Sequence, residues 1–569
     1  MNPCHHKIIR SASGLLAALA LLGFSQSGIA AGEVALKPPP SLLIDSPVSP
    51  AHEDWGFNSE VGGSICGIQT FDALSPDLLP KGSPERQWAE ARQGLLRRQI
   101  ARTHARGQLC FPTTDLFVLP RAVVTKYRAE ICDEKGSLDI HRPKLQELFR
   151  LMLRETLDKA PDLDGILIRT GEIYLHGYPY HAASGNFTED QRQGGSAILR
   201  GPESHIEILK ILREEVCVKR GKQVIYRTWS FGAQSLHESP EYYLKVTNAI
   251  EPHPGLIFSV KHQKGDFHQL TPFNPTLMIG RHRQIIEVQS QREAYGKGAH
   301  PYYIGQGVIE GWEEYAWMMK PGEPQGLRDV VGKPLYTGLW TWSRGGGWEG
   351  PTITNGLWCE LNTYVVSQFA RNPARSEKEI FDEFARRQLH LNAADAAKFR
   401  ELNLLSAKAV LRGQLTTLGA KINVWWARDH FFEEPNLGDF VKRKLVDKAL
   451  AEKAEAVAIW KEIERLAGEI HFADAETAEF VKTSAAYGRI KYAIVEQAWI
   501  IFFTGKAGDV SGKYDREKLR AAIARYDALW EEWRTLAKEH PACSTIYKDV
   551  GFEGRPGMGA GVNRYRRLL

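Results

Sequence analysis

The sequence predicts an α/β protein, in which a (β/α)8 TIM barrel is followed by a mostly helical C-terminal domain. Short apolar runs alternate with helix-like stretches from about residue 57 to 345. After about residue 375 the apolar residues recur with a helical period of 3.6 in segments rich in strong helix formers. These two observations place the barrel over residues 57–374 and the helical domain over residues 375–569.

The apolar runs have the character of parallel strands. Runs such as "DGILIRT", "GLIFSV" and "LYTGLWTW" are continuously hydrophobic rather than alternating, which is typical of strands buried on both faces. Helix-like stretches such as "KLQELFRLMLRETLDKA" lie between them. Because seven or eight such units follow one another and no glycine-rich phosphate turn follows the first strand, a barrel is favoured over a doubly wound sheet.

The N-terminus has the features of an export signal. Residues 1–31 contain a basic opening with Lys7 and Arg10, the apolar run "GLLAALALLGF" and then small residues, so we expect a removable signal peptide and a periplasmic or secreted protein. That run is shorter than the roughly 20 residues that span a bilayer, and no later run approaches this length, so no membrane span is expected. Residues 32–56 are rich in proline and predict a linking arm.

Charge and cysteine content limit the function classes. The chain has 73 basic and 68 acidic residues and no basic run, which gives no reason to expect a nucleic-acid partner. Six cysteines follow Cys4, and none forms a C-x-x-C pair, which argues against a zinc ribbon or a redox dithiol. Disulfides and buried free thiols both remain open. We expect no cofactor, and the oligomeric state is left open.

Candidate functional residues follow the predicted strands, where barrel enzymes carry their active residues. The run "GILIRTGE" ends in Glu172, and "GLIFSVKHQKGD" ends with Lys261, His262 and Asp266. The run "IIEVQSQRE" supplies Glu287 and Glu293, and "LYTGLWTWSRGGGWEG" supplies Trp342, Arg344 and Trp348. Glycosidic cleavage needs two carboxylates, one to protonate the leaving oxygen and one to activate water or attack carbon. Aromatic rings pack against sugar faces, and an arginine can hold a sugar carboxylate. A carbohydrate substrate is therefore predicted.

Two of these stretches resemble a known enzyme family. The order "VKHQKGDFHQLTPFNPTL", then "IIEVQSQREAYGKGAHPYYI", is similar to the paired motifs of family 67 α-glucuronidases. The resemblance implies that Asp266 and Glu293 position and deprotonate the attacking water, that Glu172 is the proton donor, and that the anomeric carbon is inverted. It covers about residues 160–305.

This sequence departs from the family pattern at two points. Ala294 is inserted between Glu293 and the following tyrosine, and His268 stands where the family has glutamine. A distant relative with a different sugar substrate is therefore expected, and the reaction type transfers better than the substrate.

Further residues near these exits are expected to contact substrate. Trp342 and Trp348 would form a wall of the pocket, Arg344 would clamp a carboxylate, and Glu287 would pair with Lys261 or Arg169. The predicted substrate contacts are His176, Tyr178, His181, Lys261, His262, Glu287, His300, Trp342, Arg344 and Trp348.

Two other functions remain open. A non-catalytic carbohydrate-binding protein on a decayed barrel would keep the aromatic residues but would hold its carboxylates farther apart than the roughly 6.5–9.5 Å of inverting enzymes. A metal-dependent hydrolase or lyase could use His176 and His181, which follow Glu172 in an E-x3-H-x4-H pattern. The glycine and proline residues between these histidines argue against a regular helix that carries ligands, so no metal is predicted.

Overall fold

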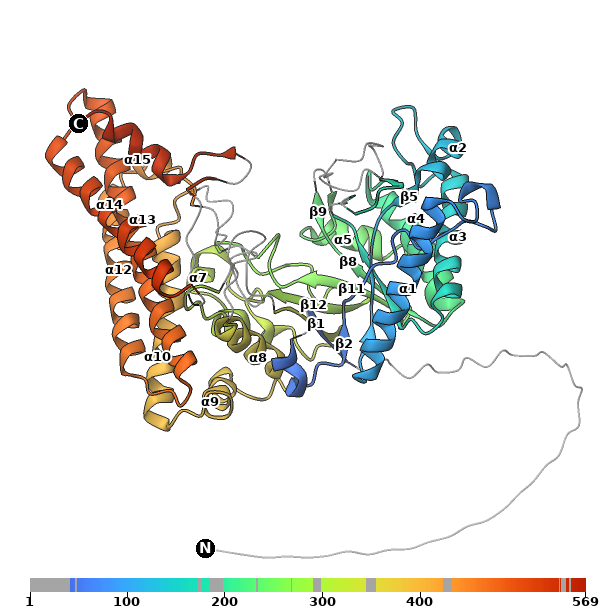
Figure 1. The fold of residues 1–569 in the computed structure, drawn as a ribbon, viewed down its shortest axis with the longest axis horizontal. Helices are drawn as coiled ribbons and strands as arrows, with labels where there is room; N and C mark the ends of the chain where they lie inside the picture. Colours follow the sequence, from blue (N-terminus) through green and yellow to red (C-terminus); the bar gives the residue numbers. More distant parts are fainter. Residues whose placement is uncertain are drawn as a thin grey trace, which may run out of the picture. The chain divides into compact units, whose positions relative to one another are not determined.

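Residues Pro39–Leu569 form one compact unit. The computed structural model describes residues 41–569 with gaps at 47–48, 172, 174, 176, 184–197, 232–233, 268, 290–297, 344–354, 423–431, 542, 544–548 and 552–553. Figure 1 shows the barrel strands in blue to yellow and the C-terminal helices in orange and red.

The central sheet is a closed barrel of eight parallel strand positions. Its strands are β1 (Leu42–Ser46), β2 (Ser59–Glu60), β3 (Leu109–Cys110) with β4 (Thr113–Asp115), β6 (Gly165–Arg169), β8 (Gln223–Arg227), β11 (Leu256–Lys261), β12 (Arg283–Gln289) and β13 (Tyr336–Trp342). β3 pairs with β2, and β4 pairs with β6, so these two short strands occupy one position in the ring. β1 pairs with β13 and closes it. The predicted (β/α)8 fold is confirmed.

The barrel is filled by apolar side chains from nearly every strand. The cluster consists of Leu42, Ile44, Phe111, Leu167, Ile225, Ile257, Ile285 and Trp340, each at most 1% exposed. Because side chains in a strand alternate between faces, the inward positions closer to the C-terminal mouth lie two or four residues after the members of this cluster. These positions hold Asp115, Arg169, Arg227, Lys261, Glu287 and Trp342. A charged layer therefore covers the apolar interior at the mouth.

Helices cover the outside of the barrel. They are α1 (Pro84–Ala105), α2 (Arg121–Ile131), α3 (Pro143–Lys159), α4 (Pro202–Leu212), α5 (Pro240–Thr247), α6 (Gly305–Glu310), α7 (Tyr315–Met318) and α8 (Leu357–Arg371), and a π-helix (Arg213–Val218) continues α4. Several begin where the sequence favours a start. In α1, Pro84 occupies the first turn and the hydroxyl of Ser83 accepts a hydrogen bond from the backbone N–H of Arg86.

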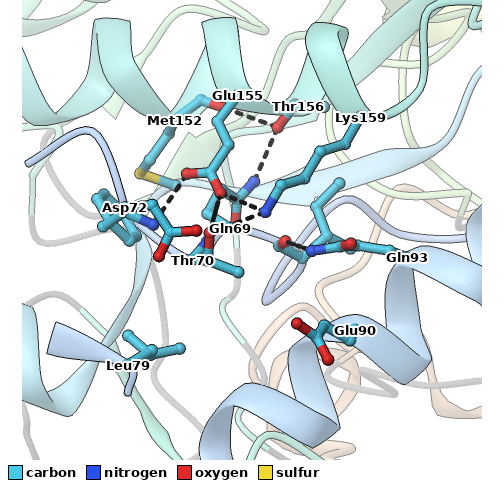
Figure 2. A network of polar contacts seen from close by, with 12 residues as sticks. Gln69, Thr70, Asp72, Leu79, Glu90, Gln93, Met152, Glu155, Thr156 and Lys159 are labelled. Atoms are coloured by element: carbon cyan, nitrogen blue, oxygen red, sulfur yellow. Dashed lines mark hydrogen bonds and ion pairs between the residues drawn. The ribbon is translucent and has the colours of Figure 1, made fainter. Parts of the chain in front are cut away.

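The loop after β2 is held against α3 by a partly buried carboxylate. Glu155 accepts hydrogen bonds from the backbone N–H and the hydroxyl of Thr70, both at 2.6 Å, and from the backbone N–H of Phe71 at 3.0 Å. Lys159 pairs with the same carboxylate at 2.5 Å. Figure 2 shows these side chains of α3 pointing toward Gln69 and Thr70. Charge-assisted bonds to backbone N–H groups are strong, so this loop is fixed at the mouth side of β2.

The first strand corrects a boundary taken from the sequence. β1 (Leu42–Ser46) lies inside residues 32–56, which the prolines had predicted to be a linking arm, so the barrel starts before residue 57. Its apolar run "LLIDS" is short and is flanked by prolines, and their abundance hid the strand. The chain then forms a short 3-10 helix, η1 (Pro50–Trp55), and the carbonyl oxygen of Trp55 accepts a hydrogen bond from Gln368 of α8.

The C-terminal region is helical, as predicted. Its helices are α9 (Glu377–Arg387), α10 (Ala393–Gln414), α11 (Gly438–Lys442), α12 (Val446–Glu469), α13 (Ala475–Ser511), α14 (Arg516–Glu539) and α15 (Met558–Arg566). Helices α12, α13 and α14 pack side by side (Figure 1). Polar contacts join this region to the barrel, because the Ser406 hydroxyl accepts a hydrogen bond from the backbone N–H of Tyr303, and Arg412 pairs with Glu313.

The six cysteines beyond Cys4 are all buried free thiols, which decides between the two states left open by the sequence. None of the helices that the structure describes is both long enough and apolar enough to cross a bilayer.

Candidate active site

A buried ion pair forms the centre of the charged layer at the barrel mouth. The guanidinium of Arg227 donates to both carboxylate oxygens of Glu287, at 2.8 and 2.5 Å. The indole N–H of Trp342 donates to the same carboxylate at 2.7 Å. Burial by itself would raise the pKa of Glu287, but the charges of Arg227 and Lys261 outweigh it and hold this pKa below its ordinary value. Glu287 is therefore an ionised, fully buried acceptor.

A second ion pair explains why an aspartate follows strand β11. The Lys261 ammonium lies 2.6 Å from Oδ1 of Asp266, and the two side chains are 3% and 15% exposed. Gly265, with a φ of 105°, supplies the turn that brings Asp266 back toward the strand end. The same ammonium lies 3.7 Å from the centre of the Trp229 ring. Burial lowers the pKa of Lys261, and Asp266 opposes that shift.

Four members of this layer are ones that the sequence analysis missed or paired differently. Asp115 lies 3.1 Å from Nε of Arg169, so Arg169 pairs with Asp115. Glu287 was expected to pair with Lys261 or Arg169, and its partner is Arg227 instead. Asp115 and Arg227 are the last residues of β4 and β8, so the strand-exit rule would have found both if it had been applied to every strand.

Tyr178 and His181 meet in a cluster with α1. The Tyr178 hydroxyl lies 3.1 Å from the Ser64 hydroxyl and accepts a hydrogen bond from Arg92 at 3.1 Å. His181, on the short strand β7 (His181–Ala183), is 2% exposed and packs against Trp88 at 5.1 Å between ring centres. Burial first, and then the nearby charges of Arg92 and Arg121, lower the pKa of His181 to about 3. His181 is therefore a neutral imidazole at physiological pH.

Two further predicted histidines lie in different surroundings. His262 is buried and stacks on Phe267 with 5.6 Å between ring centres. His300 instead packs against the helical region, 5.3 Å from the Trp460 ring, and its Nε2 is 3.4 Å from the ammonium of Lys491. The structure thus places His262 against the loop after β11 and His300 against α12 and α13.

The other predicted site residues lie outside the described residues: Glu172, His176, Glu293, Arg344 and Trp348. The described strands that precede them end at Arg169, Gln289 and Trp342. Over the part of the chain that the structure describes, no three or more His, Cys, Asp or Glu side chains are grouped so as to hold a metal ion.

Comparisons with known proteins give only distant structural neighbours. No protein-family model matches the sequence, and no curated protein matches it. A variant of the O-GlcNAc hydrolase of Thermobaculum terrenum is 9% identical, with 93% of this chain and 94% of that chain covered and a TM-score of 0.36. A GH20 exo-β-N-acetylglucosaminidase of Vibrio harveyi is 11% identical, with 55% and 45% covered and a TM-score of 0.24. Both neighbours are glycoside hydrolases.

Proposed function

We propose that the protein is an exported glycoside hydrolase that cleaves a glycosidic bond in a poly- or oligosaccharide. The observation that carries the proposal is the position of Asp266, an ion-paired carboxylate at the exit of β11 in a closed parallel barrel. The rings of Trp229 and Phe267 flank the ammonium of Lys261, which is the ion-pair partner of Asp266. A carboxylate next to aromatic rings at the C-terminal mouth of a barrel suits a sugar ligand.

In the proposed mechanism, three carboxylates act on one sugar ring. Asp266 and Glu293 position the attacking water and one of them accepts its proton, while Glu172 donates a proton to the leaving oxygen. Because the water attacks the anomeric carbon on the face opposite the leaving oxygen, the configuration of that carbon is inverted. The ion pair with Lys261 supports the role of Asp266, since a base must be ionised before it can accept a proton. The roles of Glu172 and Glu293 follow from the resemblance to α-glucuronidases.

An arginine that follows β13 favours an acidic sugar as the substrate. Arg227 and Lys261 already have carboxylate partners in the charged layer, so the candidate for a substrate carboxylate is Arg344. Arginine binds a carboxylate through two parallel hydrogen bonds. We therefore propose that the sugar carries a uronic acid and that Arg344 holds its carboxylate, while Trp342 and Trp348 form the adjoining wall.

A screen of hydrolysis tests the proposal. Purified protein is incubated with aryl glycosides and with uronic-acid-bearing oligosaccharides, beside an Asp266→Asn variant and an Asp162→Asn variant, whose residue is exposed before β6. We expect hydrolysis by the wild type and by Asp162→Asn, and a loss of about 10²–10⁴-fold in Asp266→Asn, the range for a general base. Equal turnover by all three proteins would refute the role of Asp266.

The same screen separates the alternatives. Binding of a sugar without hydrolysis by the wild type would favour a carbohydrate-binding protein. Activity that chelator abolishes and zinc restores would favour a metal-dependent hydrolase or lyase with His176 and His181. Export is tested separately by comparing the full chain with a variant that lacks residues 1–31. The full chain should be cleaved and exported, whereas the shortened variant should stay in the cytoplasm.

A further inference from the structure

A cleft lies outside the barrel wall, over the paired strands β1 and β2. In most barrels of this kind a helix follows each strand, but in the described part of the connection after β1 the only helix is the short η1. Because η1 packs toward α8, through the hydrogen bonds of Gln368 and Arg371 to Trp55, the space between η1 and α1 is left unfilled. The resulting cleft has a volume of about 820 Å³, within the range of ligand sites.

This cleft, the side cleft, reaches the barrel mouth. Val61 and Trp342 both line it, and both also pack against the apolar cluster inside the barrel. Trp342 in addition donates its indole N–H to Glu287 in the charged layer. A ligand in the side cleft can therefore be continuous with one at the mouth, with the Trp342 ring between the two.

The walls of the side cleft carry polar groups suited to hydroxyls. Glu53 follows β1, Gln99 and Arg102 belong to α1, and Arg106 is the residue directly after α1. Glu60, the last residue of β2, also lines the cleft. Glu60 accepts hydrogen bonds from Gln99 at 3.0 Å and from Thr103 at 2.7 Å, which orders that wall. Charged and amide side chains beside an aromatic ring form a lining typical of sugar sites.

One buried polar atom beside the cleft lacks a partner. His52 lines the cleft and is 3% exposed. Its Nδ1 lies 2.8 Å from Oδ2 of Asp45, and the other carboxylate oxygen of Asp45 accepts a hydrogen bond from the Ser343 hydroxyl. Nε2 of His52 has no hydrogen-bond partner in the part of the chain that the structure describes. An orphaned buried nitrogen is costly unless a ligand or water satisfies it.

We propose that the side cleft binds further sugar units of the same substrate, so that the sugar chain leaves the barrel mouth over the ends of β1 and β2 and a sugar hydroxyl hydrogen-bonds Nε2 of His52. The proposal rests on the proposed function in naming a carbohydrate. Asp45 would act as a positioning residue, because its hydrogen bond to Nδ1 fixes the imidazole ring and leaves Nε2 for the ligand. A substrate of several sugars should then be preferred over a single sugar.

A blocking variant tests the side cleft. Ala105 is exposed on α1 and lines the cleft, whereas Ala101 is exposed on the same helix outside it. The measurement is the ratio of kcat/KM on oligosaccharides of two to six sugars to kcat/KM on the matching aryl glycoside. In Ala105→Trp the indole occupies the cleft, so the longest substrates lose their contacts there. The ratio should fall about tenfold for these substrates, the loss expected when a small apolar contact with a substrate is removed. Ala101→Trp should keep the wild-type ratio.

A second variant tests the histidine itself. The amide of asparagine lies close to the position of Nδ1 of histidine, so His52→Asn keeps a donor to Asp45 and removes Nε2. We expect the ratio to fall about fivefold, as for one hydrogen bond, with the effect confined to substrates long enough to reach His52. Wild-type ratios in both Ala105→Trp and His52→Asn would overturn the proposal.

A binding measurement separates this proposal from the proposed function. If no glycoside is hydrolysed, the proposed function fails, and the side cleft is decided by calorimetric titration with the same oligosaccharides. A Kd about tenfold weaker in Ala105→Trp than in Ala101→Trp would support the cleft. Equal Kd values in the two variants, or no binding to either variant or the wild type, would overturn it.

Discussion

The ammonium of Lys261 lies 2.6 Å from the carboxylate of Asp266 and 3.7 Å from the centre of the Trp229 ring. This relationship ties the proposed base to the end of strand β11. Because Lys261 is buried and its pKa is lowered, the ion pair is held in a poorly solvated position where each partner depends on the other. The pair therefore orients Asp266 as well as balancing its charge.

Replacing Lys261 should impair catalysis strongly. Lys261→Met keeps most of the side-chain volume and removes the charge, so Asp266 loses the partner that orients it. We expect kcat/KM on the substrate found in the screen to fall about 10²-fold, since a misplaced catalytic group costs this much. Lys264→Met, in the same loop at an exposed position, should stay within about twofold. A Lys261→Met enzyme with wild-type kcat/KM would contradict the positioning role.

Breaking the Arg227–Glu287 pair should destabilise the barrel. Glu287 is 0% exposed, so Arg227→Met leaves a buried carboxylate without its main partner. The expected loss is about 3–5 kcal/mol in the free energy of unfolding, measured by denaturant titration. The matched control is Arg328→Met, which breaks an ion pair with Glu310 whose side chains are 39% and 38% exposed and should cost about 1 kcal/mol or less.

The double variant Arg227→Met/Glu287→Leu distinguishes the pair from the individual residues. With both charges removed, no unpaired carboxylate remains, so the double variant should be more stable than Arg227→Met alone. The single variant Glu287→Leu is measured as well. If the loss of stability in the double variant equals the sum of the losses in Arg227→Met and Glu287→Leu, the two groups do not interact. Activity should stay low in the double variant, because the charged layer at the mouth is lost.

Trp342 should matter through its indole N–H as well as its ring. Trp342→Phe keeps an aromatic ring but removes the donor that lies 2.7 Å from Glu287. We expect a loss of about 1–2 kcal/mol in stability and a rise in the pKa of Glu287, since that hydrogen bond helps to keep the pKa low. Trp317→Phe, at a position 43% exposed, serves as the control and should change neither property. Identical unfolding curves for both variants would contradict the prediction.

The strands that the sequence predicted were those with long apolar runs. "GILIR" and "LIFSVK" became β6 and β11 because each is buried on both faces. β1 was missed because its short run lies among prolines, and β4, "TTD", has no apolar residue at all. Such strands form because neighbouring strands pair with them, a contribution that no local pattern records.

The pairing of charges was harder to predict than their presence. Lys261 is the last residue of β11 and Asp266 follows it by five residues, and the strand-exit rule found both. Arg227 and Glu287 belong to β8 and β12, which are separated in the sheet by β11, so their side chains meet across the barrel interior. Only the register of three strands fixes this contact, and the register depends on the closed ring rather than on either segment.

The helical region also holds a buried lysine whose charge depends on pH. Lys453 of α12 is 1% exposed, and its ammonium donates to the carbonyl oxygens of Arg412 and Leu415 at the end of α10. Burial lowers the pKa of Lys453 to about 7, against the opposing charge of Glu452. In the unfolded chain a lysine has a pKa of about 10.4.

This lowered pKa predicts a pH-dependent contribution to stability. Between about pH 7 and pH 10 the unfolded chain binds a proton at Lys453 that the folded chain lacks, so the stability contributed by this group rises with pH, by up to about 1.4 kcal/mol per pH unit. Lys453→Met removes that dependence. The difference in Tm between wild type and Lys453→Met should therefore grow in favour of the wild type from pH 6 to pH 9. For Lys448→Met, exposed on the same helix, the difference should stay constant, and a constant difference for Lys453→Met would contradict the assignment.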